Sequence, residues 1–345
     1  MTTVPNAAEQ QDQQPQVPKA ILYSWQTSVW ATVPLLCLHE KGYSADEYIV
    51  KQVDITKGEN FSPSYLKIDY AGTIPTLVVP TMETTGPEVT TKYRSLKDTM
   101  TIADFLDGAR NVNTHSTTSS LPAPSLRPAT IDSKTLSDSL ISLVHMPTVD
   151  PNFLFLSART SDELDQKRKN PAGAFIRDRQ SALKRYIQEA ESIAQAKSQN
   201  AGQGADAFEQ KTVQFLKEKF AANMLLSDIY EGTAGEDTEN GFYEAAKKAW
   251  TQSLPDVLTE LENRIKGIHA LGDHISLADL HIISFLARLV EISGGKADSA
   301  GINELEAQIG TGFKVGEKVR TFWTTWTARE SFQHVFNSDF AIHHI

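Results

Sequence analysis

The sequence predicts an α/β domain at residues 19–107, followed by an all-α helical bundle at residues 129–345. Strand and helix patterns alternate along the first part in the order βαβ and then ββα. A stretch at 108–128, rich in Ser, Thr, Asn and Pro, marks the boundary, and strand patterns nearly vanish after it. Residues 1–18 are rich in Gln and Pro with few apolar side chains, so we expect a disordered tail there.

Composition limits the classes of function. The chain of 345 residues is long enough for two domains, and 40% of its residues are hydrophobic. Its formal net charge of −10 and its lack of a basic stripe argue against a nucleic-acid surface, which needs clustered Lys and Arg. No window approaches the ~18 apolar residues of a membrane span, and the polar N-terminus has no secretory signal. We therefore expect a cytoplasmic protein, in which the single Cys37 can form no internal disulfide.

Each element of the first part has a local signal. The expected strand at 19–24 is a short apolar run. The helix at 29–41 is followed by Gly42, the residue type that most often ends a helix. The remaining elements expected are strands at 48–55, 76–79 and 89–93, helical turns at 62–68, and a helix at 98–109.

Pro34 departs from the pattern of a regular helix at 29–41. It lies five residues into the helix, where proline removes an intrahelical hydrogen bond. Two arrangements satisfy the sequence. Either the helix kinks at Pro34, or it begins later, with Thr32 or Val33 at its cap.

The second part is expected to be a bundle of helices. One helix start is explicit: Ser276 is the N-cap and Asp279 is the third helical residue, which is close to a capping box. Ile275 and Leu280 can form the accompanying hydrophobic staple. The helices are expected at 133–145, 161–197, 205–230, 241–268, 276–292 and 316–335, with polar breaks at 198–204 and 231–240.

Three segments of the first part share a family pattern. Residues 21–28 read Ile-Leu-Tyr-Ser-Trp-Gln-Thr-Ser, residues 71–77 contain Gly-Thr-Ile-Pro, and residues 96–106 begin Leu-Lys-Asp-Thr. In this order and spacing they resemble the thioredoxin-like domain of the glutathione S-transferase superfamily. The Ser-x-x-Asp run at Ser276 resembles the box that begins a buried helix in the second domain of that family. The resemblance implies a thioredoxin-like domain plus an all-α domain, with glutathione as co-substrate or cofactor and a homodimer as the assembly.

Ser28 falls where this family places its catalytic Ser or Cys, and Thr27 is the neighbour that would replace it if the register shifted by one. The resemblance implies that the hydroxyl stabilises a glutathione thiolate. A thiol with a pKa of ~8.5 is mostly protonated at neutral pH, and lowering that pKa by about two units requires roughly 2.7 kcal/mol. A charge-assisted hydrogen bond and the positive end of a helix dipole can supply this free energy. If Pro34 delays the helix, Ser28 sits in a loop and gains less from the dipole.

The resemblance implies two further walls of the glutathione site. The matching proline, Pro75, is cis in the family, which exposes the backbone N–H and C=O of Ile74 to the backbone of the glutathione cysteine. At the start of the helix at 98–109, backbone N–H groups and the Thr99 hydroxyl would bind the γ-glutamyl carboxylate. Asp98 would bind the ammonium group. On the residues alone, Gly-x-x-Pro also fits an ordinary trans turn, and Asp98 also fits a first-turn acid that stabilises the helix dipole.

Other reactive residue types are not expected to take part in the chemistry. Cys37 follows Ser28 by nine residues, about 180° around an ideal helix, so we expect a buried structural thiol that faces away from the site. No metal site is expected, because the histidines lack ligand spacing. The histidines considered are His39, His115 and His145. Two lysines, which the sequence alone does not place, could lie near the glycyl carboxylate: Lys57 and Lys67.

Three functions fit these expectations. The favoured function is a transferase that activates the glutathione thiolate for attack on a small hydrophobic electrophile. In the second, glutathione is a cofactor for isomerisation, dehalogenation or ether cleavage. In the third, the fold is a binding module without turnover, which Pro34 and the long helical half would favour. The stretch at 147–155, with Phe153 and Phe155, is a candidate lining for the electrophile pocket.

Overall fold

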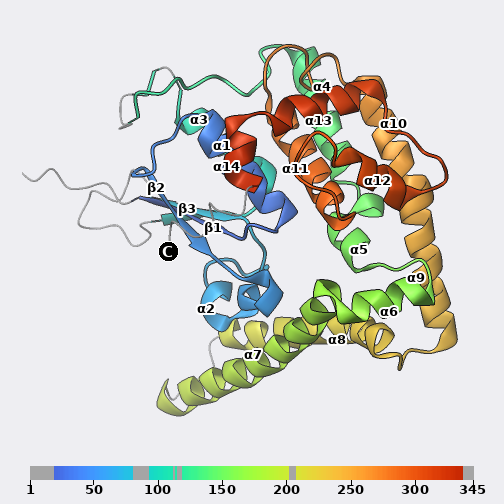
Figure 1. The fold of residues 1–345 in the computed structure, drawn as a ribbon. Coiled ribbons are helices and arrows are strands. Elements are labelled where there is room, and N and C mark those ends of the chain that lie inside the picture. Colours follow the sequence, from blue (N-terminus) through green and yellow to red (C-terminus); the bar gives the residue numbers. More distant parts are fainter. Residues whose placement is uncertain (1–18, 81–92, 112, 115–118, 202–206, 337–345) are drawn as a thin grey trace, which may run out of the picture.

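A computed structural model shows an α/β domain beside a larger domain of helices (Figure 1). The fold class expected from the sequence, a thioredoxin-like domain plus an all-α domain, is confirmed. The predicted tail at 1–18 and most of the predicted strand at 89–93 lie outside the described residues. The structure describes residues 19–80, 93–111, 113–114, 119–201 and 207–336.

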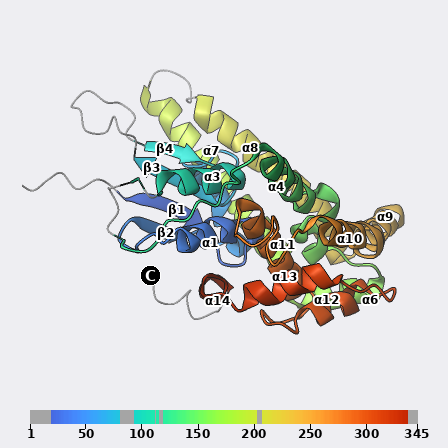
Figure 2. The same ribbon diagram turned by 90° about the horizontal axis from the view of Figure 1, so that it is seen from above.

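A mixed sheet forms the centre of the N-terminal domain. Its strands are β1 (Ala20–Ser24), β2 (Tyr48–Gln52), β3 (Thr76–Pro80) and β4 (Tyr93–Leu96). Among the described residues their order is β2-β1-β3-β4; β1 runs parallel to β2, and β3 runs antiparallel to both β1 and β4 (Figure 2). Two helices pack against each other and against this sheet, which leaves Leu22, Val33 and Ile102 fully buried. These helices are α1 (Thr32–Glu40) and α3 (Thr99–Ala109).

The first helix begins later than the pattern at 29–41 predicts. A single 3-10 turn, η1 (Val29–Ala31), precedes α1. Pro34 is then the third residue of α1, where the backbone N–H has no intrahelical acceptor to lose. The later start is therefore the arrangement that the chain adopts, although the α1 cap is Ala31 rather than Thr32 or Val33.

The C-terminal domain is built of helices, as predicted. None of the helices in the described part of the chain is long and apolar enough to cross a membrane. The helices are α4 (Ile131–Val144), α5 (Pro151–Leu156), α6 (Ser161–Lys169), α7 (Pro171–Ala201), α8 (Ala207–Glu231), α9 (Glu236–Lys248), α10 (Leu254–Arg264), α11 (Leu277–Ile292), α12 (Ile302–Ile309), α13 (Glu317–Thr327) and α14 (Glu330–Phe336).

Several predicted helix boundaries are wrong. The predicted helix at 161–197 is two helices, because Pro171 forces Asn170 into an extended conformation and ends α6. The predicted helix at 241–268 starts earlier and contains a π turn, Ala249–Ser253, between α9 and α10. The predicted helix at 316–335 is divided into α13 and α14. α5 and α12 were not predicted, because six and eight residues are too few to show a helical period.

α11 is the central helix of the C-terminal domain, and almost all of its side chains are buried. The predicted capping box at its start is confirmed. The Asp279 carboxylate accepts hydrogen bonds from the Ser276 N–H at 2.9 Å and from the Ser276 hydroxyl at 2.6 Å. Its other oxygen accepts from the Ala270 N–H at 2.9 Å. Both Ser276 and Asp279 are therefore fully used in holding the helix start.

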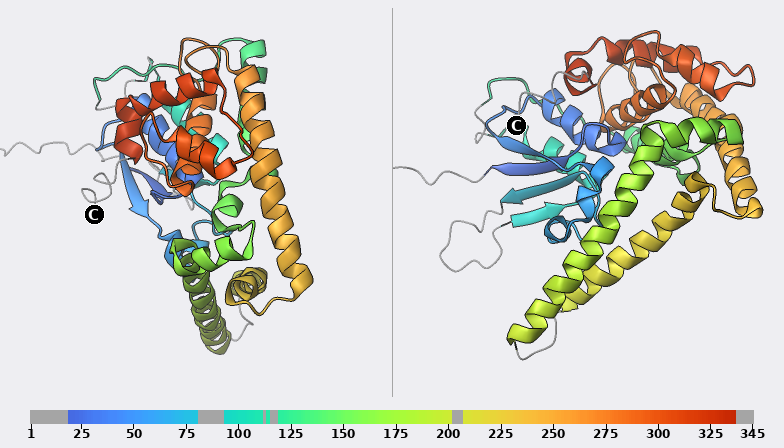
Figure 3. Two further views of the ribbon diagram at one scale, coloured as in Figure 1. Left: turned by 45° about the vertical axis from the view of Figure 1, so that its right-hand side comes forward. Right: turned by 60° about the horizontal axis from the view of Figure 1, so that its bottom comes forward.

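α7 and α8 form a long hairpin that reaches back to the N-terminal domain (Figure 3). α7 packs against the segment between β2 and β3, which contains η2 (Ile55–Lys57), η3 (Glu59–Phe61) and α2 (Pro63–Leu66). The contact is close: a Cβ on Gly58, which has φ +69°, would lie 2.8 Å from the Ala182 Cβ. Phe61 and Leu66 join the apolar cluster of this hairpin. The hairpin therefore supports one side of the N-terminal domain.

Candidate functional site

Three loops of the N-terminal domain meet at one edge of the sheet. The strand register pairs Tyr23 with Thr76, so the end of β1 lies beside the start of β3. It also pairs Leu77 with Leu96, so the end of β4 reaches the same edge. The turn after β1, the loop before β3 and the first turn of α3 continue from these strand ends. They carry the predicted site residues: Thr27 and Ser28, Ile74 and Pro75, and Asp98 and Thr99.

Ser28 is the residue that precedes η1, in the turn after β1. Its N–H donates to the Trp25 carbonyl at 3.0 Å, and its carbonyl accepts from the Ala31 N–H at 3.0 Å. Its side chain caps no N–H of η1 and bonds to no other group in the described ranges, although the residue is only 9% exposed. The hydroxyl is therefore available to a ligand. Thr27 lies one residue earlier in the same turn and is half-buried.

The Ile74–Pro75 peptide bond is cis, as the family pattern predicts. The loop before it is held by side chains from η3 and α2: Asn60 donates to the Gly72 carbonyl at 2.7 Å, and the Tyr65 hydroxyl donates to the Thr73 carbonyl at 2.6 Å. Within the described ranges, the backbone N–H and C=O of Ile74 make no hydrogen bond. Those two groups are therefore left for a ligand.

Asp69 holds the same loop, the one before Pro75, through hydrogen bonds to Thr73. Its carboxylate accepts from the Thr73 N–H at 2.9 Å and from the Thr73 hydroxyl at 2.6 Å. Burial acts to raise the pKa of Asp69, but these hydrogen bonds, together with those from Ala71 and Lys97, outweigh it and lower the pKa. Asp69 is thus a charged anchor that the sequence alone did not indicate.

Asp98 and Thr99 form the start of α3. Asp98 is the N-cap, and one of its oxygens accepts from the Thr101 N–H at 2.8 Å and from the Thr101 hydroxyl at 2.9 Å. Asp98 therefore caps the helix, whereas the residues alone indicated a first-turn acid inside it. Thr99 is 7% exposed, and its hydroxyl bonds to none of the described groups. The first N–H groups of α3 have no intrahelical acceptor, so this helix start can bind an anion.

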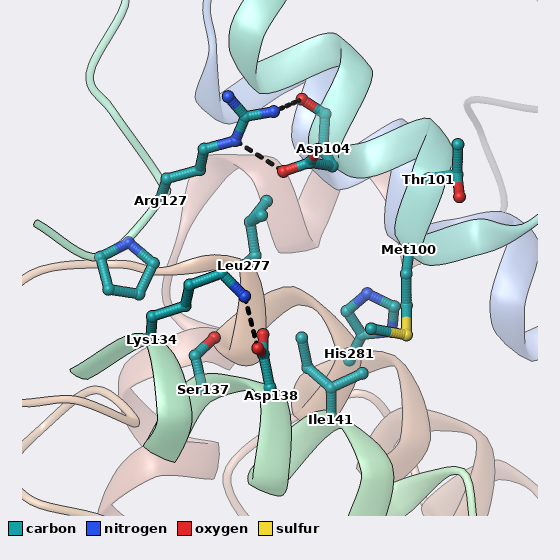
Figure 4. Close-up of a pocket in the computed structure, with 11 residues that line it drawn as sticks. Met100, Thr101, Asp104, Arg127, Lys134, Ser137, Asp138, Ile141, Leu277 and His281 are labelled. Atoms are coloured by element: carbon teal, nitrogen blue, oxygen red, sulfur yellow. Dashed lines mark hydrogen bonds and ion pairs between the residues drawn. The ribbon is translucent and has the colours of Figure 1, made fainter. Parts of the chain in front are cut away.

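A pocket of about 620 Å³ adjoins this helix start, between α3, α4 and α11 (Figure 4). Met100 and Ile141 give it apolar walls, and His281 of α11 lies at its base. Two ion pairs lie around it: Arg127 with Asp104 at 2.6 Å, and Lys134 with Asp138 at 2.5 Å. The other lining residues are Thr101, Pro128, Ser137 and Leu277.

Two histidines connect this pocket to the turn that follows Ser28. His145 Nε2 lies 2.9 Å from His281 Nδ1, and the His145 ring stacks on the Trp30 indole at a centroid distance of 3.6 Å. Burial, with a smaller effect of His145, lowers the pKa of His281 to about 3. Burial also lowers the pKa of His145, against an opposing effect of Asp98. Both rings are therefore neutral at neutral pH, and one donates a hydrogen bond to the other.

The sequence did not indicate this histidine pair. His145 lacks the spacing of a metal ligand, and its own surroundings in the chain indicate no other role. No signal in the sequence joins two histidines that lie 136 residues apart. Among the described residues, no group of three or more His, Cys, Asp or Glu side chains could hold a metal ion.

Cys37 and the stretch at 147–155 both lie away from the pocket in Figure 4. Cys37 is fully buried, its thiol lies 3.7 Å from the Ala103 carbonyl, and burial raises its pKa, so it faces the α1–α3 contact and not the site. The stretch at 147–155 contributes no lining to the pocket in Figure 4. Phe153 packs on the main core, and Phe155 packs on Phe175 with ring centroids 6.3 Å apart.

Both the sequence and the fold of this chain are similar to those of known proteins. Residues 22–114 match the family model described as the glutathione S-transferase N-terminal domain, which confirms the resemblance seen in the sequence. None of the curated proteins matches this chain.

Solved structures resemble nearly the whole chain. Beta-etherase LigF from Sphingobium sp. strain SYK-6 is 14% identical with a TM-score of 0.50, covering 92% of this chain and 99% of the other. Gtt2 from Saccharomyces cerevisiae is 13% identical with a TM-score of 0.49, covering 91% and 99%. A glutathione transferase family member from Pseudomonas fluorescens pf-5, solved with two glutathione bound, is 12% identical with a TM-score of 0.49, covering 92% of each chain. The first similarity shows a shared two-domain fold.

Proposed function

We propose that this chain, whose residues 22–114 form a glutathione S-transferase N-terminal domain, binds glutathione and activates its thiolate for attack on a small hydrophobic electrophile. One observation carries the proposal. Three loops converge at one sheet edge, and each presents hydrogen-bonding groups that the described residues leave unused. Hydrogen-bonding groups without a protein partner are uncommon on residues as buried as Ser28 and Thr99, and a cluster of them favours a ligand site.

Ser28 is the proposed catalytic residue. Its hydroxyl donates a hydrogen bond to the glutathione sulfur and stabilises the thiolate over the thiol. Lowering the thiol pKa by about two units takes roughly 2.7 kcal/mol. A hydrogen bond to a charged acceptor contributes about 1.5–3 kcal/mol. Because α1 begins only at Thr32, the hydrogen bond supplies most of this free energy and the helix dipole less.

The remaining loops would bind the peptide itself. The Ile74 N–H and C=O pair with the backbone of the glutathione cysteine, next to the cis bond at Pro75. The γ-glutamyl carboxylate lies at the start of α3, where the Thr99 hydroxyl and the first N–H groups donate to it. The free carboxylate oxygen of Asp98 accepts from the ammonium group, while the other oxygen keeps the cap.

The electrophile would bind in the pocket between α3, α4 and α11. Its volume of about 620 Å³ suits a small molecule, and its Met100 and Ile141 walls are apolar. His281 lines this pocket and contacts His145, whose ring stacks on Trp30, so the pocket is connected to the turn that carries Ser28. The stretch at 147–155 is replaced in this role by residues of α3 and α4.

One observation favours a second candidate, in which glutathione is a cofactor that is regenerated. The neutral imidazole pair of His145 and His281 can pass a proton, and an isomerisation needs a proton transfer that displacement of a stable anionic leaving group by a thiolate does not. Consumption of one thiol per turnover distinguishes conjugation from this alternative. A cytoplasmic homodimer is part of either proposal, and light scattering of the purified protein tests the dimer.

Calorimetric titration of the protein with glutathione tests the proposal. We expect one site per chain in the micromolar to millimolar range. A panel of small electrophiles with a thiol assay should then show loss of free glutathione. Absence of binding up to millimolar glutathione would contradict the proposed site. Binding without turnover on any electrophile or isomerisable substrate would support the binding-module alternative.

A further inference from the structure

Arg179 of α7 has a half-buried guanidinium group without an acceptor. No carboxylate, carbonyl or hydroxyl among the described residues accepts a hydrogen bond from it, and its Nε is fully enclosed. Other half-buried arginines of the same domain are paired: Arg159 lies 2.6 Å from Glu163, and Arg329 lies 2.8 Å from Glu40. The nearest acid along the helix, Asp178, already pairs with Lys57.

Two aromatic rings hold this guanidinium. Its central carbon lies 4.8 Å from the Phe61 ring centroid and 5.8 Å from that of Phe175. Contacts with ring faces fix a planar cation but satisfy none of its N–H donors, which point outward in its own plane. The two rings therefore orient the group, its Nε is enclosed without a partner, and its two terminal nitrogens are left to solvent or to a ligand.

The position of Arg179 relates it to the proposed glutathione site. Phe61 belongs to η3, and a Cβ on Gly72 would lie only 3.2 Å from the Phe61 ring. Asn60, the residue before it, holds the Gly72 carbonyl. A single ring thus connects Arg179 to the loop that leads to Ile74 and Pro75.

On its other side the group faces the helical domain. Phe175 packs on Phe155 at 6.3 Å, and the Arg288 guanidinium of α11 lies 4.9 Å from the Phe155 ring. Arg288 differs from Arg179 because it donates to Glu291 at 2.7 Å. Arg179 therefore lies in an aromatic row between the two domains, and it is the member of that row with no counter-charge among the described residues.

A half-buried guanidinium whose open nitrogens have only water as a partner is stabilised when a ligand supplies a carboxylate. Burial lowers the pKa of Arg179. The planar fork of N–H groups matches a carboxylate, which can accept two of them in one plane. We infer that Arg179 binds a carboxylate of the ligand held at the proposed glutathione site. This inference rests on the proposed function and adds a residue from a helix outside the family-matched segment.

Two carboxylates could occupy this position. One is the glycyl carboxylate of glutathione, which the three loops leave unassigned. The other is an acid group on the electrophile or on its conjugate. Both present a carboxylate to Arg179. Pairs of ligands that differ only in whether one of these carboxylates is present show which of the two it binds.

Calorimetry with two ligand pairs tests the inference on the full chain. The first pair is glutathione and its glycyl ethyl ester, and the second is S-(para-carboxybenzyl)glutathione and S-benzylglutathione. For the pair whose carboxylate meets Arg179, Arg179→Gln should weaken the acid about tenfold and leave its uncharged counterpart nearly unchanged. The matched control is Arg185→Gln, because Arg185 lies on the same helix, is exposed and also stacks on an aromatic ring, that of Tyr186, at 4.7 Å.

The outcomes are separable. If the acid-to-neutral affinity ratio of both pairs is the same in wild type and Arg179→Gln, the inference is overturned while the proposed function stands. If wild type binds none of the four ligands, the proposed function itself fails. Should Arg179→Gln not fold, Arg179→Lys keeps the charge without the planar fork and should reduce the acid affinity by about fivefold; an unchanged ratio in that variant overturns the inference equally.

Discussion

Ser28 directly precedes the 3-10 turn η1 and Ser276 directly precedes α11, and the two hydroxyls are used in opposite ways. The Ser276 hydroxyl donates to Asp279 at 2.6 Å, and the residue is 3% exposed. Ser28 is nearly as buried, yet its hydroxyl bonds to none of the described residues. A serine at a helix start normally serves the helix. One that does not is available for a ligand, in keeping with the role proposed for Ser28.

Replacing Ser28 should give the largest functional effect. Ser28→Ala removes the proposed hydrogen bond to the thiolate. At neutral pH, kcat/KM for glutathione should therefore fall about a hundredfold, which corresponds to about two units of thiol pKa. Glutathione affinity at pH 7 should fall only about fourfold, which is the part of the pKa change that appears in binding. Thr27→Ala is the control and should keep activity. The reverse pattern, with Ser28→Ala active and Thr27→Ala inactive, would shift the site by one residue.

The buried histidine pair should make the free energy of unfolding depend on pH. The pKa of His281 is about 3 in the fold against an ordinary value of about 6.5, so between these values the unfolded chain binds a proton that the folded chain excludes. Stability from this group is complete above pH 6.5 and is lost as the pH falls. From pH 7 to pH 5 the loss is about 2 kcal/mol. Urea unfolding should show a smaller fall with pH for His281→Asn, and equal slopes for the two proteins would contradict this.

Asp98 caps α3 and is also proposed to bind the glutathione ammonium group. Two substitutions distinguish the effect of each role. Asp98→Asn keeps a cap on α3 but loses the charge, so glutathione affinity should fall about tenfold with little change in stability. Asp98→Ala should show the same loss of affinity and also lower the free energy of unfolding by about 1 kcal/mol. Wild-type affinity in Asp98→Asn would remove Asp98 from the site.

Ser276→Ala should have the smallest functional effect of the four. Loss of the capping box should lower the free energy of unfolding by about 1–2 kcal/mol. Below the melting temperature, kcat and KM should equal those of wild type. If Ser276→Ala impaired kcat/KM as strongly as Ser28→Ala, the contrast between the two serines would be lost.

Features encoded by short segments were predictable from the sequence. The element order and the capping box at Ser276 each depend on a few neighbouring residues. The cis bond at Pro75 was expected only through the resemblance to a family. The start of α1 was not settled, because both a kink and a late start satisfy the local rules for Pro34.

Features that depend on tertiary packing were not predictable. The contact between His145 and His281 joins helices that no local pattern connects. The same holds for Arg179: its helical setting was expected, but its contact with Phe61 depends on how α7 folds back on η3. Whether the aromatic side chains at 147–155 face a pocket or a core likewise depends on packing: Phe153 packs on the main core and Phe155 on Phe175.

The thiolate of bound glutathione can be observed directly by its ultraviolet absorbance during a pH titration of the complex. We expect an apparent thiol pKa about two units below that of the free peptide in wild type, and a value close to that of the free peptide in Ser28→Ala. A wild-type complex whose thiol titrates like free glutathione, or a Ser28→Ala complex that keeps the lowered pKa, would contradict the proposed role of the Ser28 hydroxyl.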